Sequence, residues 1–256
     1  MTSSDKNPII VVENLTARFG DRTIFTNVSF QVNEGEVLVI LGGSGCGKST
    51  LMKQMIGLYR PASGRVLIKG VDINTPDEVQ LRQLRMQIGV LFQSSALFGS
   101  MTLGENVALP LGEYTDLSPA SIDLLVRMKL AMVNLTGSAE LLPSELSGGM
   151  KKRAGLARAM ALDPSILFFD EPSAGLDPIT SAELDNLIKT INSSLGTTMV
   201  IVTHELESIF DIAHRVVMLD KTAKGLIAEG DPHYLREHST DPRVVNFFQR
   251  RVGELK

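Results

Sequence analysis

The stretch Gly42-Gly43-Ser44-Gly45-Cys46-Gly47-Lys48-Ser49 fits a phosphate-binding pattern of glycine, four free positions, glycine, lysine, and then serine or threonine. The apolar residues 36–41 precede it and have the composition of a strand buried on both faces. A helical pattern follows over residues 48–58. This order of strand, glycine-rich loop and helix is the context in which the pattern binds phosphate.

The loop has the chemistry that a phosphate group needs. Its glycines let the backbone curl so that successive N–H groups converge on an anion, and the start of the helix adds partial positive charge. Lys48 is expected to reach the outer phosphates, and Ser49 to supply a hydroxyl for Mg2+. We expect Cys46 to be a small filler rather than a reactive thiol. The nucleotide-binding residues predicted here are Gly42, Gly43, Ser44, Gly45, Cys46, Gly47, Lys48, Ser49 and Thr50.

The composition is that of an ordinary globular protein. The chain has 256 residues, of which 43% are hydrophobic and 21% charged, enough for one large core or two small ones. Its formal net charge of -4 gives no general attraction to nucleic acid phosphates. A nucleic acid partner is therefore disfavoured.

Targeting and redox features favour a cytosolic protein. The apolar runs are far shorter than the roughly 20 residues that cross a bilayer, and residues 1–8 have no apolar signal core. The chain has one cysteine, which permits no internal disulfide and agrees with a reducing compartment.

The chain shows three kinds of pattern in succession. Short alternating segments predict a small antiparallel layer at residues 9–19, 28–32 and 65–69. A buried strand is predicted at residues 88–92, and helices follow at 103–109, 118–132 and 148–162, which favours an inserted helical subdomain over about residues 94–161. Strands at 166–169, 198–202 and 216–219 then alternate with helices at 181–195 and 205–212. That alternation predicts a parallel sheet covered by helices.

Residues 231–256 form a separate C-terminal tail. Asp231-Pro232 and Asp241-Pro242 are typical helix starts, and the second opens a helical segment over residues 243–251. We expect the tail to pack on its own domain, and a contact with a partner is the alternative.

Two carboxylates, Asp170 and Glu171, end the apolar run at residues 166–169. The carboxyl edge of a parallel sheet is where ligands of such folds bind. Asp170 is expected to hold Mg2+ through water, and Glu171 to act as the general base that polarises an attacking water.

A second anion site is predicted at Ser147-Gly148-Gly149. A serine and two glycines at the start of a helical pattern offer a hydroxyl and backbone N–H groups to an anion. One chain therefore carries two candidate phosphate sites.

At this point the sequence resembles the ATP-binding cassette (ABC) family, whose signature is Leu-Ser-Gly-Gly followed usually by glutamine. The matching residues are Leu146 to Met150, so methionine stands where glutamine is usual. The resemblance implies an α/β fold, a P-loop NTPase (RecA-like) ABC nucleotide-binding domain at residues 8–230 with an antiparallel β subdomain and an inserted helical subdomain. It also implies an ATPase that uses ATP and Mg2+, and a head-to-tail homodimer in which the signature of one subunit closes on the nucleotide of the other.

The rest of the family pattern occurs in the expected order. The resemblance implies that Phe19 stacks on adenine, with a core phenylalanine as the alternative. Gln93 is expected to sense the γ-phosphate and to contribute to the Mg2+ site beside the permease contact. Asp177 lies in the loop that crosses the dimer interface, and His204 is expected to contact the γ-phosphate.

Within the family, three segments look like the Mla-type phospholipid transport ATPases: residues 144–150, 91–98 and 241–244. That resemblance implies an ATPase at the cytoplasmic face of a bacterial inner membrane, held there by an MlaE-like permease. It implies further an MCE-domain subunit (MlaD-like) and a STAS-domain subunit (MlaB-like). Such a system moves phospholipid between the inner and outer membranes and supports outer-membrane lipid asymmetry.

Other functions fit parts of the same pattern. The same ATPase serving another permease, such as an amino-acid importer, differs only in its partner. A soluble cassette protein acting on ribosomes or DNA generally has two cassettes or a long coiled-coil insertion, and this chain has neither. A phosphate-loop kinase or GTPase leaves Ser147-Gly148-Gly149 and His204 unexplained.

Overall fold

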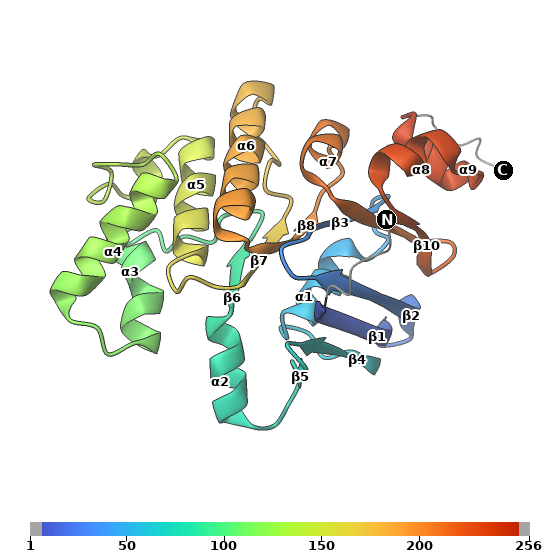
Figure 1. Ribbon diagram of the computed structural model, residues 1–256, viewed down its shortest axis with the longest axis horizontal. Helices are drawn as coiled ribbons and strands as arrows, with labels where there is room; N and C mark the ends of the chain where they lie inside the picture. The colour runs from blue at the N-terminus through green and yellow to red at the C-terminus, as the bar shows by residue number, and fades with distance from the viewer. Residues whose placement is uncertain (1–6, 251–256) are drawn as a thin grey trace. The chain divides into compact units, whose positions relative to one another are not determined.

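The computed structural model describes residues 7–250, which Figure 1 shows with their helices and strands labelled. The chain forms two structural units. One comprises the chain up to Leu84 together with the chain from Thr198 onward, and the other spans Arg85–Thr197. The predicted helical subdomain at about residues 94–161 lies within the second unit, and its boundaries stay a prediction.

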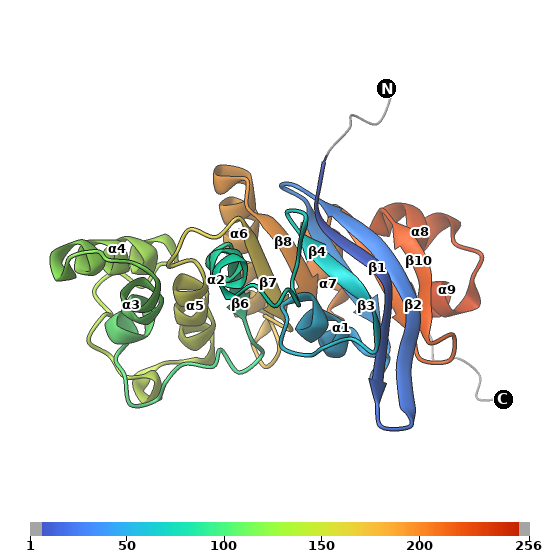
Figure 2. The ribbon, with the colours of Figure 1, turned by 90° about the horizontal axis from the view of Figure 1, so that it is seen from below.

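The first unit contains the predicted antiparallel layer. Its strands, in the order β2-β1-β4-β5, are β2 (Arg22–Asn33), β1 (Pro8–Phe19), β4 (Ser63–Ile68) and β5 (Val71–Asp72). Figure 2 shows β1 and β2 as a long hairpin, in which Phe19 pairs with Arg22 beside the turn. Strand β2 therefore starts well before residue 28, where the alternating pattern placed it.

A second group of strands in this unit carries the phosphate-binding stretch. The order is β10 (Gly225–Gly230), β9 (Arg215–Asp220), β3 (Val37–Gly42) and β8 (Thr198–Val202). Strand β3 is parallel to both β8 and β9, and β10 is antiparallel to β9. All residues of β3 and β8 are buried, as the apolar runs predict. The predicted parallel arrangement is confirmed, whereas β10 was not predicted.

The helix after the loop is shorter than its apolar pattern. Helix α1 (Lys48–Met55) ends before Gly57, which has a φ of 74°. A left-handed residue cannot continue a right-handed helix, so Gly57 ends α1 although residues 56 and 58 are apolar. Helix α2 (Glu78–Met86), which was not predicted, spans the boundary between the units.

The described part of the tail packs on its own unit. Helices α8 (Pro232–His238) and α9 (Pro242–Phe248) follow β10, and Val244 is fully buried. The ring of Phe210, in α7 (Leu206–Ile212), lies 5.6 Å from that of Phe248 and 5.1 Å from that of His233. This agrees with the expected packing of the tail, although Arg251 lies outside the described residues.

The second unit combines two parallel strands with helices. Strand β6 (Ile88–Leu91) pairs with β7 (Ile166–Asp170), whose five residues are all buried, whereas β6 alternates between buried and half-buried positions. Helices α3, α4 and α5 contact one another. The helical elements are α3 (Leu103–Tyr114), α4 (Pro119–Met132), the 3-10 turn η1 (Pro143–Glu145), α5 (Gly148–Ala159) and α6 (Pro178–Leu195).

Side-chain caps fix where these helices begin. Thr102, Ser118, Ser147 and Asp177 each accept a backbone hydrogen bond from the first turn of α3, α4, α5 and α6, respectively. At α3 the cap is reciprocal, because Glu105 also accepts a hydrogen bond from the N–H of Thr102. The starts of α5 and α6, at the predicted residues Ser147 and Asp177, are thus set by short polar side chains, whereas α1 follows Gly47 without a side-chain cap.

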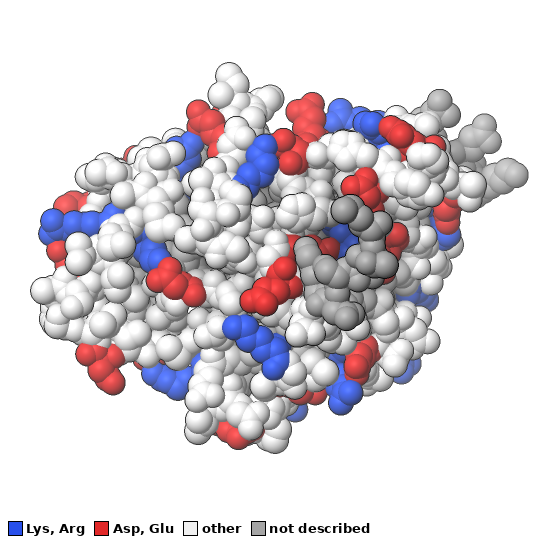
Figure 3. All heavy atoms as spheres, in the orientation of Figure 1, with Lys and Arg blue, Asp and Glu red and all other residues white. Residues whose placement is uncertain are grey.

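The surface agrees with the modest net charge. On the face drawn in Figure 3, basic and acidic side chains lie interspersed over the molecule. Among the helices of residues 7–250, none combines the length and the apolar character that crossing a bilayer requires.

Candidate functional site

The phosphate-binding stretch is a tight loop that requires glycine at two positions. Gly42 has a φ of 144° and Gly47 a φ of 105°. A Cβ at Gly42 would lie 2.3 Å from the carbonyl oxygen of Leu219, and one at Gly47 would lie 2.6 Å from Cγ2 of Ile24. Any side chain at either position would therefore clash, and the backbone can follow this curve only with glycine.

The loop presents its backbone outward and its cysteine inward. Residues 43–45 are exposed, whereas Cys46 has only 1% of its surface exposed. Burial raises the pKa of the Cys46 thiol, and the nearby positive charge of Lys48 opposes that rise. The ammonium of Lys48 donates hydrogen bonds to the carbonyl oxygens of Gly42 at 2.8 Å and Gly43 at 3.2 Å. These contacts hold the lysine over the loop, where an anion would meet it.

His204 lies at the same edge of the sheet as the loop. Strands β3 and β8 are parallel neighbours with Ile40 opposite Val202, so Gly42 and His204 both follow the carboxyl ends of adjacent strands. The side chain of His204 is 58% exposed, and its Nε2 lies 3.6 Å from Oε1 of Glu205. The first unit therefore brings His204 and the loop to one edge.

Phe19 is a surface residue and not a core phenylalanine. It is 50% exposed at the end of β1, and its ring meets that of Tyr59 edge to face at 5.7 Å. The ammonium of Lys53, in α1, lies 5.5 Å from the Tyr59 ring. An exposed aromatic pair can stack on a planar ligand. Sequence reasoning did not identify Tyr59, because a lone tyrosine in a loop carries no pattern.

Gln93, Asp170 and Glu171 meet at one edge of the second unit. Leu91 of β6 lies opposite Phe169 of β7, so the residues that follow these parallel strands emerge at the same edge. Gln93 is exposed, while Asp170 is 7% exposed. Glu171 has a φ of 48°, a conformation that is rare for a residue with a side chain. The structure thus brings these three residues to one edge, and their roles stay predictions.

Lys152 joins two of these segments and was not among the predicted residues. It is 5% exposed, and its ammonium donates to the carbonyl oxygens of Gln93 at 2.6 Å and Glu171 at 3.2 Å. Burial lowers the pKa of Lys152, and the negative charges of Asp170 and Glu171 oppose that effect. In the sequence it stands within Lys151-Lys152-Arg153, a run typical of a solvated helix face.

Ser147 and Gly148 form an exposed helix start. The hydroxyl oxygen of Ser147 accepts a hydrogen bond from the N–H of Met150 at 3.2 Å. Gly149 is buried, and a Cβ there would lie 2.5 Å from Cγ2 of Thr180 in α6. The two glycines thus differ in function: Gly148 leaves backbone accessible to an anion, and Gly149 allows α5 to approach α6.

Asp177 has a structural contact of its own. Its carboxylate accepts hydrogen bonds from the backbone N–H groups of Ile179 and Thr180 and from the Thr180 hydroxyl, the last at 2.6 Å. These bonds, that from the Thr180 hydroxyl above all, hold the pKa of Asp177 below its usual value. Asp177 therefore caps α6, and its predicted place in the nucleotide site remains a prediction.

The predicted Mg2+ donors are a hydroxyl, an amide and a carboxylate, from Ser49, Gln93 and Asp170. An all-oxygen set suits Mg2+, which binds few protein oxygens and keeps water and phosphate as its other ligands. Within residues 7–250, no three His, Cys, Asp or Glu side chains lie close enough to hold a metal ion. The donor chemistry fits an ion bound mainly by phosphate and water.

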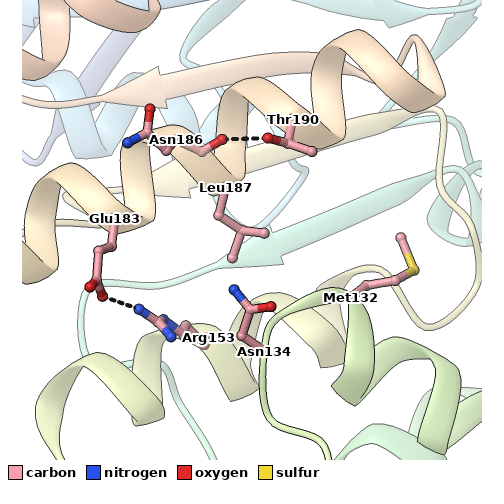
Figure 4. A pocket seen from close by; sticks show the side chains of 7 residues that line it. All are labelled: Met132, Asn134, Arg153, Glu183, Asn186, Leu187 and Thr190. Atoms are coloured by element: carbon pink, nitrogen blue, oxygen red, sulfur yellow. Dashed lines mark hydrogen bonds and ion pairs between the residues drawn. The ribbon is translucent and has the colours of Figure 1, made fainter.

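A cavity of about 420 Å³ lies elsewhere in the second unit. Figure 4 shows the ion pair between Arg153 and Glu183 on its wall, and the hydroxyl of Thr190 donating to the carbonyl oxygen of Asn186. It is lined by Met132, Asn134, Arg153, Glu183, Asn186, Leu187 and Thr190. None of these belongs to the predicted nucleotide site.

Comparison with known proteins places this geometry in a family. The ABC transporter family pattern matches residues 25–174. The chain is 43% identical, over 94% of its length and 90% of the relative, to the intermembrane phospholipid transport system ATP-binding protein MlaF of Haemophilus influenzae. It is also 43% identical to the probable ribonucleotide transport ATP-binding protein mkl of Mycobacterium tuberculosis, over 96% of this chain and 68% of the relative.

Solved structures show the same fold. CbiO1 of Clostridium perfringens, part of the ABC transporter complex cbiONQ, matches with a TM-score of 0.81 and 29% identity, covering 93% of this chain and 94% of that one. A dimeric post-hydrolysis state of the ATP-binding cassette MJ0796, bound to ADP and phosphate, matches with a TM-score of 0.78 and 31% identity, covering 87% and 98%. The predicted P-loop NTPase fold is confirmed.

Proposed function

The chain belongs to the ABC transporter family, and we propose that it is the ATPase subunit of a transporter that moves phospholipids between the inner and outer membranes. As a member of that family it is an ATPase whose hydrolysis of ATP is coupled to transport. In the proposed system, this transport maintains the lipid asymmetry of the outer membrane.

The observation that carries the proposal is that one chain contains two candidate anion sites. In the loop at residues 42–49, Lys48 donates hydrogen bonds to the carbonyl oxygens of Gly42 and Gly43, and α5 begins with exposed Ser147 and Gly148. In a head-to-tail homodimer, α5 of each subunit would close over the loop of the other. ATP would then be bound by both chains, so its binding would drive closure and its hydrolysis would allow opening.

In the proposed site, the predicted residues bind different parts of ATP. Lys48 would bind the outer phosphates, Phe19 would stack on the adenine ring, and His204 would contact the γ-phosphate. Bound Mg2+ would neutralise phosphate charge, with Ser49, Gln93 and Asp170 as its protein donors.

Glu171 would accept the proton of the attacking water as general base. Its φ of 48° distinguishes its backbone from that of Asp170, which is the last residue of strand β7. Two neighbouring carboxylates could thereby serve two separate roles.

The proposed partners follow from the relatives that the chain resembles. MlaF is named for an intermembrane phospholipid transport system. We assign to this chain an MlaE-like permease, an MCE-domain subunit (MlaD-like) and a STAS-domain subunit (MlaB-like). Through the permease the ATPase would sit on the cytoplasmic face of the inner membrane.

A second candidate cargo is a ribonucleotide. The relative with that printed function is as similar in sequence, 43% identical, as the phospholipid transport proteins. An amino-acid importer also remains an alternative. The segments shared with the Mla-type ATPases at residues 91–98 and 144–150 favour phospholipid.

The cargo is tested by transport in the assembled complex. The tagged chain is purified with the subunits that accompany it and reconstituted into vesicles containing a fluorescent phospholipid. ATP-dependent transfer of the phospholipid is expected, and it should stop with Glu171→Gln and persist with Glu140→Gln, a change at an exposed carboxylate of the same unit. ATP-dependent uptake of a ribonucleotide or an amino acid, without phospholipid transfer, would contradict the proposed cargo.

A further inference from the structure

Helix α5 packs closely on the turn that follows Gln93. A Cβ at Gly155 would lie 2.7 Å from Cδ1 of Leu91 and 3.2 Å from Cβ of Ser95, so this face of α5 fits against the turn without a side chain between them. One helical turn further along, Arg158 donates to the carbonyl oxygens of Ser95 at 2.9 Å and Ala96 at 2.7 Å.

The turn itself has an unusual backbone. Ser95 and Ala96 are consecutive residues with φ values of 63° and 48°. Each such conformation costs on the order of 1 kcal/mol or more and persists only where the surroundings hold it. The two hydrogen bonds from Arg158 stabilise this backbone conformation of the turn, and they connect the turn to α5.

Lys152 lies on the same face of α5, three residues before Gly155, and extends the contact to a second segment. Its ammonium contacts the carbonyl oxygen of Gln93 on one side and that of Glu171 on the other. One buried side chain thus connects α5, the segment after β6 and the segment after β7. All three lie within the second unit.

Stability alone does not account for an ammonium in this place. Removing a lysine charge from water costs several kcal/mol, and a well-packed apolar residue is often as stable at such a position. The ammonium of Lys152 has three N–H donors on one nitrogen, and these can hold the two carbonyl groups in fixed positions relative to the helix. A carbonyl held in place restrains the backbone of its residue, and with it the position from which the side chain starts.

We propose that Lys152 is a positioning residue that aligns Gln93 and Glu171 with the helix that begins at Ser147. This inference rests on the proposed function, because it assigns Lys152 to the ATPase reaction. Lys152 itself need not touch the nucleotide. It acts through the backbone, so its loss should slow hydrolysis while the phosphate loop still binds ATP.

The test compares Lys152→Met, which keeps the length and volume of the side chain but removes the donors, with Lys152→Arg. Both are measured in the assembled transporter at saturating ATP. For Lys152→Met we expect kcat to fall by about tenfold to hundredfold, as for small misplacements of reacting groups, and KM for ATP to stay within about twofold. Lys152→Arg should recover much of the rate because it restores a cation with several donors.

The matched control is Lys129→Met. Lys129 is also buried in the second unit, at 4% exposure, but its ammonium pairs with the exposed carboxylate of Asp163. This variant also removes a buried ammonium from the second unit, but it should leave kcat of the folded protein unchanged. If Lys152→Met does not fold, Lys152→Leu, which also lacks hydrogen-bond donors, replaces it, with the same expected loss of kcat.

An unchanged kcat in Lys152→Met would overturn the inference. An equal loss of rate in Lys152→Met and Lys129→Met, in proportion to their loss of stability, would also overturn it. So would a loss of rate in Lys152→Met that Lys152→Arg does not recover. If the wild-type complex hydrolyses no ATP, the proposed function fails first and the inference fails with it. The inference is supported if kcat falls in Lys152→Met but not in Lys129→Met, and if Lys152→Arg recovers much of the rate.

Discussion

The hydroxyl oxygen of Ser147 accepts a hydrogen bond from the backbone N–H of Met150 at 3.2 Å, so the serine of the proposed second anion site also caps its own helix. Two roles therefore coincide in one side chain. The cap uses the oxygen as an acceptor, which leaves the hydroxyl hydrogen available to an anion. A substitution that keeps the cap but repels an anion can separate the two.

Ser147→Asp is that substitution, because aspartate caps helices as well as serine does. The melting temperature is expected to stay the same. Two like charges about 4 Å apart repel by roughly 4 kcal/mol at an effective dielectric of about 20, so ATP turnover should fall by about a hundredfold or more. The melting temperature is measured by thermal unfolding, and ATP turnover is measured by phosphate release.

Ser118→Asp is the control for that experiment. Ser118 caps α4 with the same geometry, accepting from the N–H of Ser121 at 3.2 Å, and lies outside the predicted site. Its turnover should match that of the wild type. Equal turnover in both aspartate variants would remove Ser147 from the site.

Lys48→Ala should weaken nucleotide binding. The ammonium lies over the loop, held by the carbonyl oxygens of Gly42 and Gly43, and the loss of one charged hydrogen bond costs about 1.5–3 kcal/mol. A titration with a fluorescent ATP analogue should show affinity about tenfold to hundredfold lower. Lys221→Ala, at an exposed position of the same unit, should bind normally. Normal affinity in Lys48→Ala would count against the phosphate-binding role of the loop.

The reactivity of Cys46 should report the burial of the loop interior. Its thiol pKa is raised, so at any given pH less of it is thiolate, the reactive form. Alkylation by iodoacetamide at pH 8 should be slow in the folded chain and fast in urea, and its rate should rise only above the usual thiol pKa. Because the chain has one cysteine, mass spectrometry follows this site alone.

Lys48→Ala provides the control for that measurement. Burial raises the pKa of the Cys46 thiol, and the positive charge of Lys48 opposes this effect. Without that charge the pKa of Cys46 should rise further, so alkylation should be slower. Rapid alkylation of the folded wild-type chain at pH 7 would show that Cys46 is not enclosed.

Much of the site was readable from the sequence because its parts are local. The loop at residues 42–49 places its own donors within a few residues, and the carboxylates at Asp170 and Glu171 follow directly from the apolar strand before them. The register of parallel strands then brings Gln93 to the same edge. These features depend on short-range pattern and on the common direction of the strands.

Other features depend on packing between distant segments and had no local signal. Lys151, Lys152 and Arg153 form one basic run, yet Lys152 is buried against two carbonyl groups and Arg153 pairs with Glu183. The end of α1 was missed for a similar reason, because the apolar pattern continues past Gly57, whose backbone ends the helix.

In the proposed homodimer, ATP is hydrolysed only between two chains, and this is tested by measuring the specific ATPase activity as a function of protein concentration. Phosphate release by the full-length wild-type chain is measured over a dilution series, with the mass of the species recorded at each point. We expect the activity per chain to fall as the ATP-bound dimer dissociates on dilution. Constant activity per chain at concentrations where only monomer is present would contradict it.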